Sequence, residues 1–153
     1  MCRMTIQSPI GPLTLTAAEN ALTGITFGDA REGADTPSPA LELAARELAE
    51  YFAGERREFT VPLAPEGTAF QRSVWDELRR IPYGETASYK DVSTRLGKPG
   101  AAIAVGQANS KNPIPIIIPC HRVIGANGRM VGYTGGMHIK KALLAIEGIT
   151  CKD

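Results

Sequence analysis

Short runs of β-branched and apolar residues, separated by glycine and proline, open the chain. Residues 4–17, "MTIQSPIGPLTLTA", place a Pro-Ile-Gly-Pro turn between two such runs, and "ALTGITFG" at 21–28 adds a third. Threonine, isoleucine, leucine and phenylalanine favour strands, while glycine and proline favour the turns between them. The pattern predicts a small antiparallel sheet, built as a meander or from hairpins, and a polar loop over 29–38.

A helical spacing of apolar residues follows. Ser38 has the chemistry of an N-cap, Pro39 suits the first helical position, and Gly54 marks the end. The apolar face recurs every three or four residues, at Leu41, Ala44, Ala45, Leu48, Tyr51 and Phe52. Residues 55–66 contain two prolines and no long periodic segment, which is typical of a linker.

The chain beyond this linker is mostly helical. Apolar periodicity and capping residues predict four helices, over 69–81, within 88–97, within 99–112 and over 137–148. Asn127-Gly128 between β-rich flanks predicts a hairpin. The fold class is therefore α+β, with an N-terminal domain over 1–66, linker included, and a mainly helical C-terminal domain over 67–153.

The two short helices within 88–112 are joined by a tight Gly-Lys-Pro-Gly turn. This arrangement occurs both in DNA-binding helix-turn-helix motifs and in ordinary pairs of antiparallel helices. Spacing alone favours the ordinary pair, because such pairs are common. The second helix is rich in Ala, Gly, Gln, Asn and Ser, and such small residues let a backbone approach a groove or another helix closely.

Charge divides the chain in the same place as the linker. Residues 1–68 carry five Lys and Arg against ten Asp and Glu, whereas residues 69–153 carry twelve against six. A basic second half indicates contact with a polyanion, although small proteins also acquire such asymmetry by chance.

The cysteine count and the apolar runs predict the compartment. Three cysteines stand far apart, at Cys2, Cys120 and Cys151. An odd number without close pairs indicates free thiols in a reducing compartment. The apolar runs are much shorter than a membrane span, and the N-terminus does not resemble a signal peptide. We expect a cytoplasmic protein with no membrane association, no zinc and no cofactor.

Residues 112–123, "NPIPIIIPCHRV", hold the candidate chemistry. Three prolines exclude a helix and limit strand pairing, so a short buried strand is expected at 116–118, with Cys120 at the turn after it. A thiol that directly follows so rigid a segment of chain is suited to act as a positioned nucleophile, although a buried structural cysteine is the commoner case. In extended chain His121 would point away from Cys120, so a bridging water is expected between them. Glu147, at the end of an apolar helix, is the carboxylate expected to orient the imidazole.

The pentapeptide "PCHRV", preceded by "NPIPIII" and followed by "GYTGG" and "LLAIEG", resembles the O6-alkylguanine-DNA alkyltransferases. The resemblance runs from residue 67 to residue 148. "SPIGPLTLTA" and "YFAGE" also resemble the N-terminal, RNase H-like domain of bacterial members. It implies a DNA repair protein that flips O6-alkylguanine out of duplex DNA and takes the alkyl group irreversibly, in one turnover.

The resemblance also implies roles for individual residues. Cys120 would be the nucleophile, His121 the base acting through water and Glu147 its partner. Tyr89 and Lys140 would assist the guanine leaving group, and Asn112 would support the thiol segment. The alkylguanine pocket would include Ser88, Val131, Tyr133, Thr134 and Gly135. The DNA-contacting residues would be Ala101, Ala102, Ile103, Gly106, Gln107 and Arg122.

The chain departs from the family pattern at Ile103. The family usually reads "AARAVG" in the second helix, and here it is "AAIAVG". An apolar wedge can still unstack bases but cannot hydrogen-bond to the orphaned cytosine, so weaker DNA binding or slower repair is expected. Two other functions are weighed: a DNA-damage sensor, which would lack this cysteine, and a cysteine hydrolase, which would leave the basic second half unexplained. A monomer is expected, and cooperative binding on DNA is left open.

Overall fold

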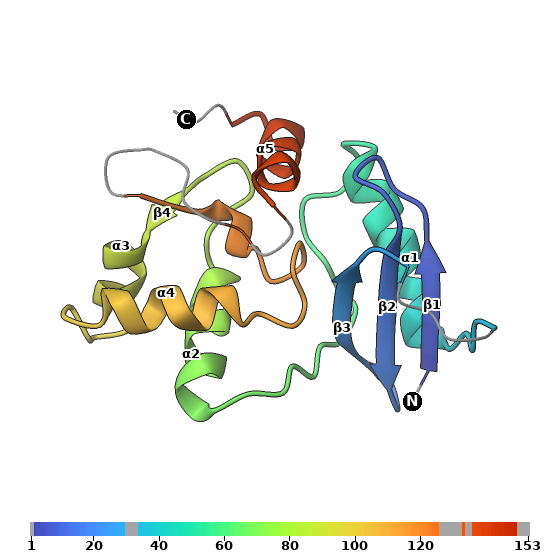
Figure 1. The fold of residues 1–153 in the computed structure, drawn as a ribbon, viewed down its shortest axis with the longest axis horizontal. Helices are drawn as coiled ribbons and strands as arrows, with labels where there is room; N and C mark the ends of the chain where they lie inside the picture. The colour runs from blue at the N-terminus through green and yellow to red at the C-terminus, as the bar shows by residue number, and fades with distance from the viewer. Residues whose placement is uncertain (1, 30–33, 126–132, 134–135, 150–153) are drawn as a thin grey trace. The chain divides into compact units, whose positions relative to one another are not determined.

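The protein is seen in a computed structural model that describes residues 2–29, 34–125, 133 and 136–149 (Figure 1). The chain forms two compact units, residues 1–66 and 67–153. The hairpin expected at Asn127-Gly128 lies outside the described residues.

The N-terminal unit is built on the predicted antiparallel meander. Strands β1 (Cys2–Ile6), β2 (Leu13–Ala18) and β3 (Ala21–Phe27) lie in sequence order in one sheet. The register pairs Met4 with Leu15 and Leu15 with Ile25. Helix α1 (Pro39–Phe52) contacts all three strands and buries its apolar face in a core with β2.

A buried carboxylate attaches the segment after α1 to this unit. Glu47 is fully buried on α1 and accepts hydrogen bonds from the backbone amides of Thr60 and Val61, at 3.0 and 2.9 Å, and from the Thr60 hydroxyl at 2.7 Å. Arg56 lies 3.1 Å from the same carboxylate. Burial alone would raise the pKa of Glu47, but these hydrogen bonds and the charge of Arg56 hold the pKa below its ordinary 4.5.

Glu47→Gln is expected to lower the free energy of unfolding of this unit by about 1–3 kcal/mol at neutral pH. Because the folded pKa lies below the unfolded one, the contribution of Glu47 is present above pH 4.5 and is lost as the pH falls through the folded pKa. Hydrogen exchange of α1 and residues 55–61, measured against pH, checks both statements. Glu42→Gln, on the exposed side of α1, is the matched control, and equal exchange in the two variants would contradict the prediction.

The C-terminal unit consists of short helices around one very short sheet. It contains α2 (Ala69–Leu78), β4 (Ala87–Ser88), α3 (Tyr89–Arg95), α4 (Ala102–Ser110), the 3₁₀ turn η1 (Cys120–Arg122), β5 (Val123–Ile124) and α5 (Met137–Ile146). Thr68 and Ser88 each close a capping box, at the starts of α2 and α3. Helices α2, α3 and α4 contact one another, and the indole of Trp75 donates to the Ala108 carbonyl across α2 and α4 at 2.9 Å.

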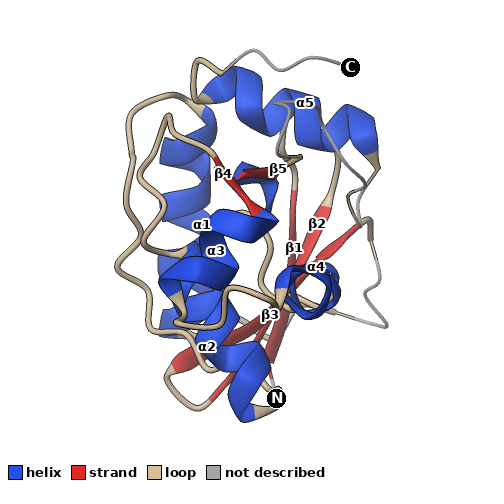
Figure 2. Cartoon of the chain, turned by 90° about the vertical axis from the view of Figure 1, so that its left-hand side faces the viewer, coloured by secondary structure: helices blue, strands red, loops and turns tan. Residues whose placement is uncertain are grey.

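The β4–β5 pair places the reactive segment. The two strands are parallel and pair Ala87 with Val123 and Ser88 with Ile124. They lie between α3 and α5 (Figure 2). Because β5 directly follows η1 and β4 directly precedes α3, the pair holds Cys120 near Tyr89, the first residue of α3.

The prediction of a strand at 116–118 is wrong. These isoleucines are buried, but the chain turns there: the Ile118 amide donates to the Ile114 carbonyl at 2.9 Å, and Ile116 has a φ of 77°. A β-branched residue in this left-handed region is strained. Tertiary packing therefore overrides the local preference of the isoleucine run for strand.

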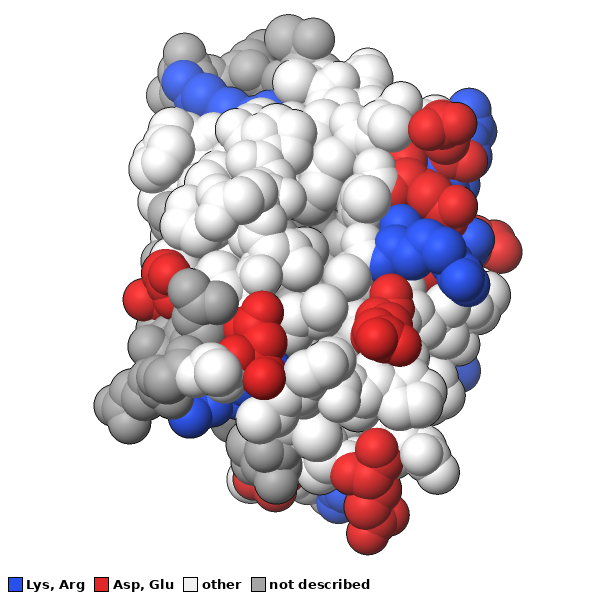
Figure 3. Space-filling model, turned by 90° about the vertical axis from the view of Figure 1, so that its right-hand side faces the viewer, with Lys and Arg blue, Asp and Glu red and all other residues white. Residues whose placement is uncertain are grey.

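Charged side chains are unevenly spread. On the face in Figure 3, acidic side chains are scattered over a largely uncharged surface, and basic groups lie beside some of them. Among the described residues no helix has the length and apolar character that crossing a membrane requires.

Candidate active site

Three consecutive side chains of η1 are buried together. Cys120, His121 and Arg122 are 5%, 0% and 6% exposed. The 3₁₀ turn replaces the extended chain expected here, and its amide groups bond locally, with Cys120 N to Ile118 O at 2.7 Å and Arg122 N to Pro119 O at 3.0 Å. The turn thus places three polar side chains inside the unit within three residues.

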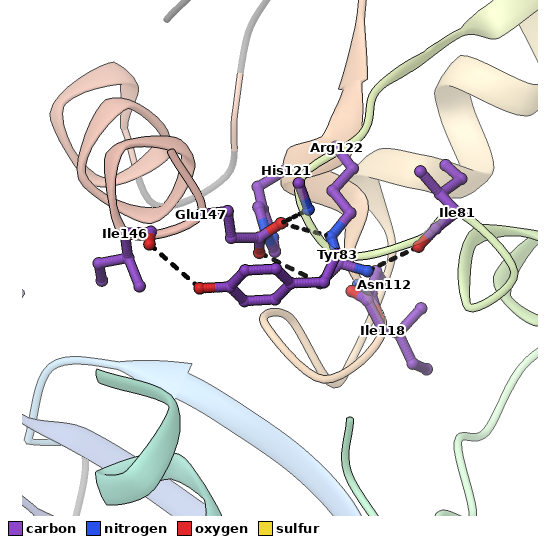
Figure 4. Close-up of polar contacts among 9 residues, drawn as sticks. Ile81, Tyr83, Asn112, Ile118, His121, Arg122, Ile146 and Glu147 are labelled. Carbon is purple, nitrogen blue, oxygen red and sulfur yellow. Dashed lines mark hydrogen bonds and ion pairs between the residues drawn. The ribbon is translucent and has the colours of Figure 1, made fainter. Parts of the chain in front are cut away.

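Glu147, the C-cap of α5, is the centre of the polar network (Figure 4). Its side chain is fully buried. Oε2 lies 2.6 Å from His121 Nε2 and accepts from Arg122 Nη2 at 3.2 Å. Oε1 accepts from Arg122 Nε at 2.8 Å and from the Gly84 amide at 3.2 Å. One carboxylate therefore connects α5, η1 and the loop after α2.

This geometry fixes the tautomer of His121. A carboxylate accepts hydrogen bonds, so Nε2 carries the proton and Nδ1 is free to accept one. Nδ1 is buried and has no hydrogen-bond partner among the described residues. Burial lowers the pKa of His121; Glu147 opposes this shift, and the charges of Arg122 and Lys140 add to it. The ring is therefore a neutral base at neutral pH.

Cys120 is held as a thiol. Burial raises its pKa above the ordinary 9.0, although side-chain hydrogen bonds with Asn112 and Tyr133 and the charge of Lys140 act in the opposite direction. The thiolate that a displacement needs must therefore form during the reaction, by proton transfer to a base. The neighbouring His121 has the required free nitrogen.

Three other expected residues lie in the same neighbourhood. Asn112 donates to the Ile118 carbonyl at 2.8 Å and accepts from the Ile114 amide at 2.9 Å, which secures the turn before Cys120. Lys140 is fully buried on α5, and its ammonium donates to the Val123 carbonyl at 2.7 Å. Burial raises the pKa of Tyr89 above its ordinary 10.0, and a thiolate at Cys120 would raise it further, so the Tyr89 hydroxyl stays protonated and can donate.

The residues expected to line the alkylguanine pocket are only partly described. Tyr133 interacts with Cys120, as stated above. The Ser88 hydroxyl caps α3 by accepting from the Asp91 amide at 3.0 Å, so a capping role accounts for it in this structure. Val131, Thr134 and Gly135 lie outside the described residues.

The residues expected to contact DNA divide into two groups. Ala101, Ala102, Ile103, Gly106 and Gln107 lie on or beside α4, where Ile103 is 81% exposed. Tyr89 of α3 packs near Gly106, with Cε1 3.7 Å from the position of a Cβ there. Arg122 lies elsewhere: its guanidinium is buried on Glu147 and donates to the Ile81 carbonyl at 2.7 Å. A guanidinium held this way is not free to bind a phosphate, so the structure corrects the expectation for Arg122.

Tyr83 joins this site without having been predicted from the sequence. Its hydroxyl donates to the Ile146 carbonyl at 3.1 Å, and the Arg122 guanidinium lies 5.8 Å from its ring centroid. The only signal in the sequence was its place in the Pro-Tyr-Gly turn after α2, which says nothing of a partner so distant along the chain.

Two family models match the chain, and between them they cover almost all of it. The model described as "6-O-methylguanine DNA methyltransferase, DNA binding domain" matches residues 69–149, and the one described as the ribonuclease-like domain of the same proteins matches residues 1–65. The chain belongs to the 6-O-methylguanine DNA methyltransferase family. Both units of the fold are thus accounted for by one family.

Individual members of the methyltransferase family are similar over nearly their full length. The chain is 49% identical to a methylated-DNA–protein-cysteine methyltransferase of Methanosarcina acetivorans, over 93% of this chain and 95% of that one. It is 52% identical to the protein of that name from Mycobacterium tuberculosis, over 94% and 90%. A crystal structure of Mycobacterium tuberculosis OGT in complex with DNA matches with a TM-score of 0.86 and 50% identity, over 95% of this chain and 92% of that one.

Proposed function

We propose that Cys120 accepts the alkyl group of O6-alkylguanine in duplex DNA, and that each molecule does so once. Family membership supplies the reaction class: the chain is a DNA repair methyltransferase that transfers the alkyl group to its own cysteine. The single observation that supports Cys120 as the acceptor is its position beside His121, a neutral base whose tautomer Glu147 fixes.

The proposed reaction is a single displacement at the alkyl carbon. The bond from Sγ to the alkyl carbon forms as the bond from that carbon to guanine O6 breaks. The thiol proton passes through a water to Nδ1 of His121, and the departing guanine takes a proton from the Tyr89 hydroxyl, with the Lys140 ammonium stabilising the charge. The product is a thioether, which does not hydrolyse, so the protein is consumed.

Because the Cys120 thiol is buried, the alkylated guanine must move to the thiol. Cys120 is 5% exposed, and a guanine stacked in a duplex cannot reach a group inside the protein. We therefore propose that the damaged nucleotide leaves the stack, at a cost of a few kcal/mol, and that α3 and α4 hold the duplex. Helix α4 is rich in small side chains, which would let the DNA backbone come close to it.

Intact mass spectrometry after incubation with a duplex containing O6-methylguanine tests the proposal. The expected result is one added methyl group per molecule, located on the peptide containing Cys120, with repaired guanine in the DNA. An undamaged duplex of the same sequence is the control. Unmodified protein with unrepaired DNA would reject the proposal, and repeated turnover of an ester or amide would favour a hydrolase.

Ile103→Arg is expected to strengthen DNA binding, because it places a cation and hydrogen-bond donors at the most exposed large apolar side chain described. The slope of log affinity against log salt should steepen by about 0.9 per added phosphate contact. Binding titrations at several salt concentrations and single-turnover transfer rates measure the effect. Gln107→Arg adds the same charge one turn along α4, so an equal gain there, or no gain in either variant, would contradict a special role for position 103.

A further inference from the structure

Arg122 has no role in the proposed reaction, although it is among the most fully engaged side chains of the site. Its guanidinium donates three hydrogen bonds of 3.2 Å or less: Nε and Nη2 donate to the two carboxylate oxygens of Glu147, and Nη1 donates to the Ile81 carbonyl. The guanidinium carbon also lies 5.8 Å from the centroid of the Tyr83 ring. The side chain is 7% exposed. Burying this charge is costly, and the pairing with Glu147 and the Ile81 carbonyl offsets that cost.

The contacts of Arg122 restrict how Glu147 can lie. A planar guanidinium that meets both carboxylate oxygens permits essentially one orientation of the carboxylate. The Gly84 amide adds a further contact to Oε1, which leaves Oε2 directed at His121 Nε2 (Figure 4). Without Arg122 the carboxylate could rotate, and the proton on Nε2 would lose its fixed acceptor.

Tyr83 adds a contact to the guanidinium from the loop after α2. Its hydroxyl is bonded to the Ile146 carbonyl at the end of α5, so its ring is held against the guanidinium. A ring in this position attracts the cation and limits access of water to it. The side chains of Arg122 and Glu147 are 7% and 0% exposed, so solvent competes little for the hydrogen bonds between them.

We propose that Arg122 is a positioning residue for alkyl transfer, which holds Glu147 so that His121 presents an unprotonated Nδ1 to the thiol. This inference rests on the proposed function of Cys120 and deepens it. Arg122 touches neither DNA nor the reacting atoms; it acts through Glu147.

The charge of Arg122 also contributes to keeping His121 neutral. Among the residues that the structure describes, the charged and titratable groups near the ring are Glu147 and Lys140 of α5, Arg122 and the adjacent Cys120 of η1, and Tyr83, which faces Arg122 from the loop after α2. Arg122 and Lys140 lower the pKa of His121, whereas Glu147 raises it. Loss of Arg122 therefore makes the ring easier to protonate, and a protonated ring cannot take the thiol proton.

Arg122→Gln is the decisive variant, measured by single-turnover transfer at saturating O6-methylguanine duplex. We expect the rate to fall on the order of tenfold or more, the size of loss seen when the hydrogen-bond partner that orients a metal-binding histidine is removed. The acid limb of the pH–rate profile should move to higher pH, because the pKa of His121 rises. The affinity for DNA should stay unchanged. Arg80→Gln removes the same charge from a side chain that is 74% exposed, and should alter none of these quantities.

The Glu147→Gln background separates positioning from a structural role. If Arg122 acts through Glu147, Arg122→Gln should add little to the loss of rate that Glu147→Gln already causes. Arg122→Lys keeps the charge but cannot bridge both oxygens, so it should keep the pH midpoint while remaining slower than the native protein. This variant also decides the matter if Arg122→Gln does not fold.

Three results would overturn the proposal. One is a native rate and pH profile in Arg122→Gln, or in Arg122→Lys if only that variant folds. Another is a loss of DNA affinity with an unchanged rate at saturation, which would make Arg122 a DNA contact. The third is a full additional loss of rate in the Glu147→Gln background. Failure of the proposed function looks different, because the native protein itself would then gain no methyl group.

Discussion

Cys120→Ser is expected to take up no methyl group from an O6-methylguanine duplex. An alcohol is a far weaker acid and a poorer nucleophile than a thiol, so the transfer rate should fall by roughly four orders of magnitude or more. Serine is nearly the same size as cysteine, and position 120 is buried, so the fold and the DNA affinity should be retained. Intact mass and a DNA-binding titration on the same sample measure both.

The matched control is Cys2→Ser. Cys2 is a partly exposed residue of β1 in the N-terminal unit, and its replacement should leave transfer at the native level. Methyl uptake by Cys120→Ser would show that another residue is the acceptor and would refute the assignment of Cys120. A loss of DNA binding in the same variant would mean that the thiol supports the fold as well as the reaction.

Glu147→Ala is expected to lower the free energy of unfolding of the C-terminal unit by about 3–5 kcal/mol. The change removes one carboxylate that accepts four hydrogen bonds, from Arg122 twice, His121 and Gly84. It leaves the Arg122 guanidinium buried without a counter-charge. Urea denaturation followed by circular dichroism measures the loss, and transfer should fall together with stability.

Glu85→Ala provides the comparison, because Glu85 is an exposed carboxylate in the loop that also contains Gly84. Its removal should change the free energy of unfolding by no more than about 0.5 kcal/mol. A small effect of Glu147→Ala, comparable to that of Glu85→Ala, would mean that water or a rearrangement satisfies Arg122. The positioning proposal would then lose its physical basis as well.

Much of the fold could be predicted because local signals determine it. The turn at residues 9–12 and the Thr- and Ile-rich runs around it specify the meander of β1 to β3. Ser38 caps its helix at the expected position, and Thr68 and Ser88 cap α2 and α3 in the same way, because a side-chain oxygen that accepts from an amide three residues on acts within one turn of chain. The resemblance of "PCHRV" to a known family supplied the reaction class.

What could not be predicted depends on contacts between distant segments. The isoleucines at 116–118 favour a strand locally, yet Asn112 and the packing around them impose a turn with Ile116 in the left-handed region. An arginine such as Arg122 is a residue type that commonly binds phosphate, but here its partners are Glu147 and the Ile81 carbonyl, which lie 25 and 41 residues away in the sequence. A periodic pattern carries no information about such pairings.

The hydrogen bond from Trp75 to the Ala108 carbonyl gives the protein a built-in optical reporter. Trp75 is the single tryptophan of the chain and is 2% exposed, and its indole meets α4 directly. Its fluorescence therefore depends on how α4 is seated against α2. Association with DNA could be followed through this emission without a label, separately from methyl transfer.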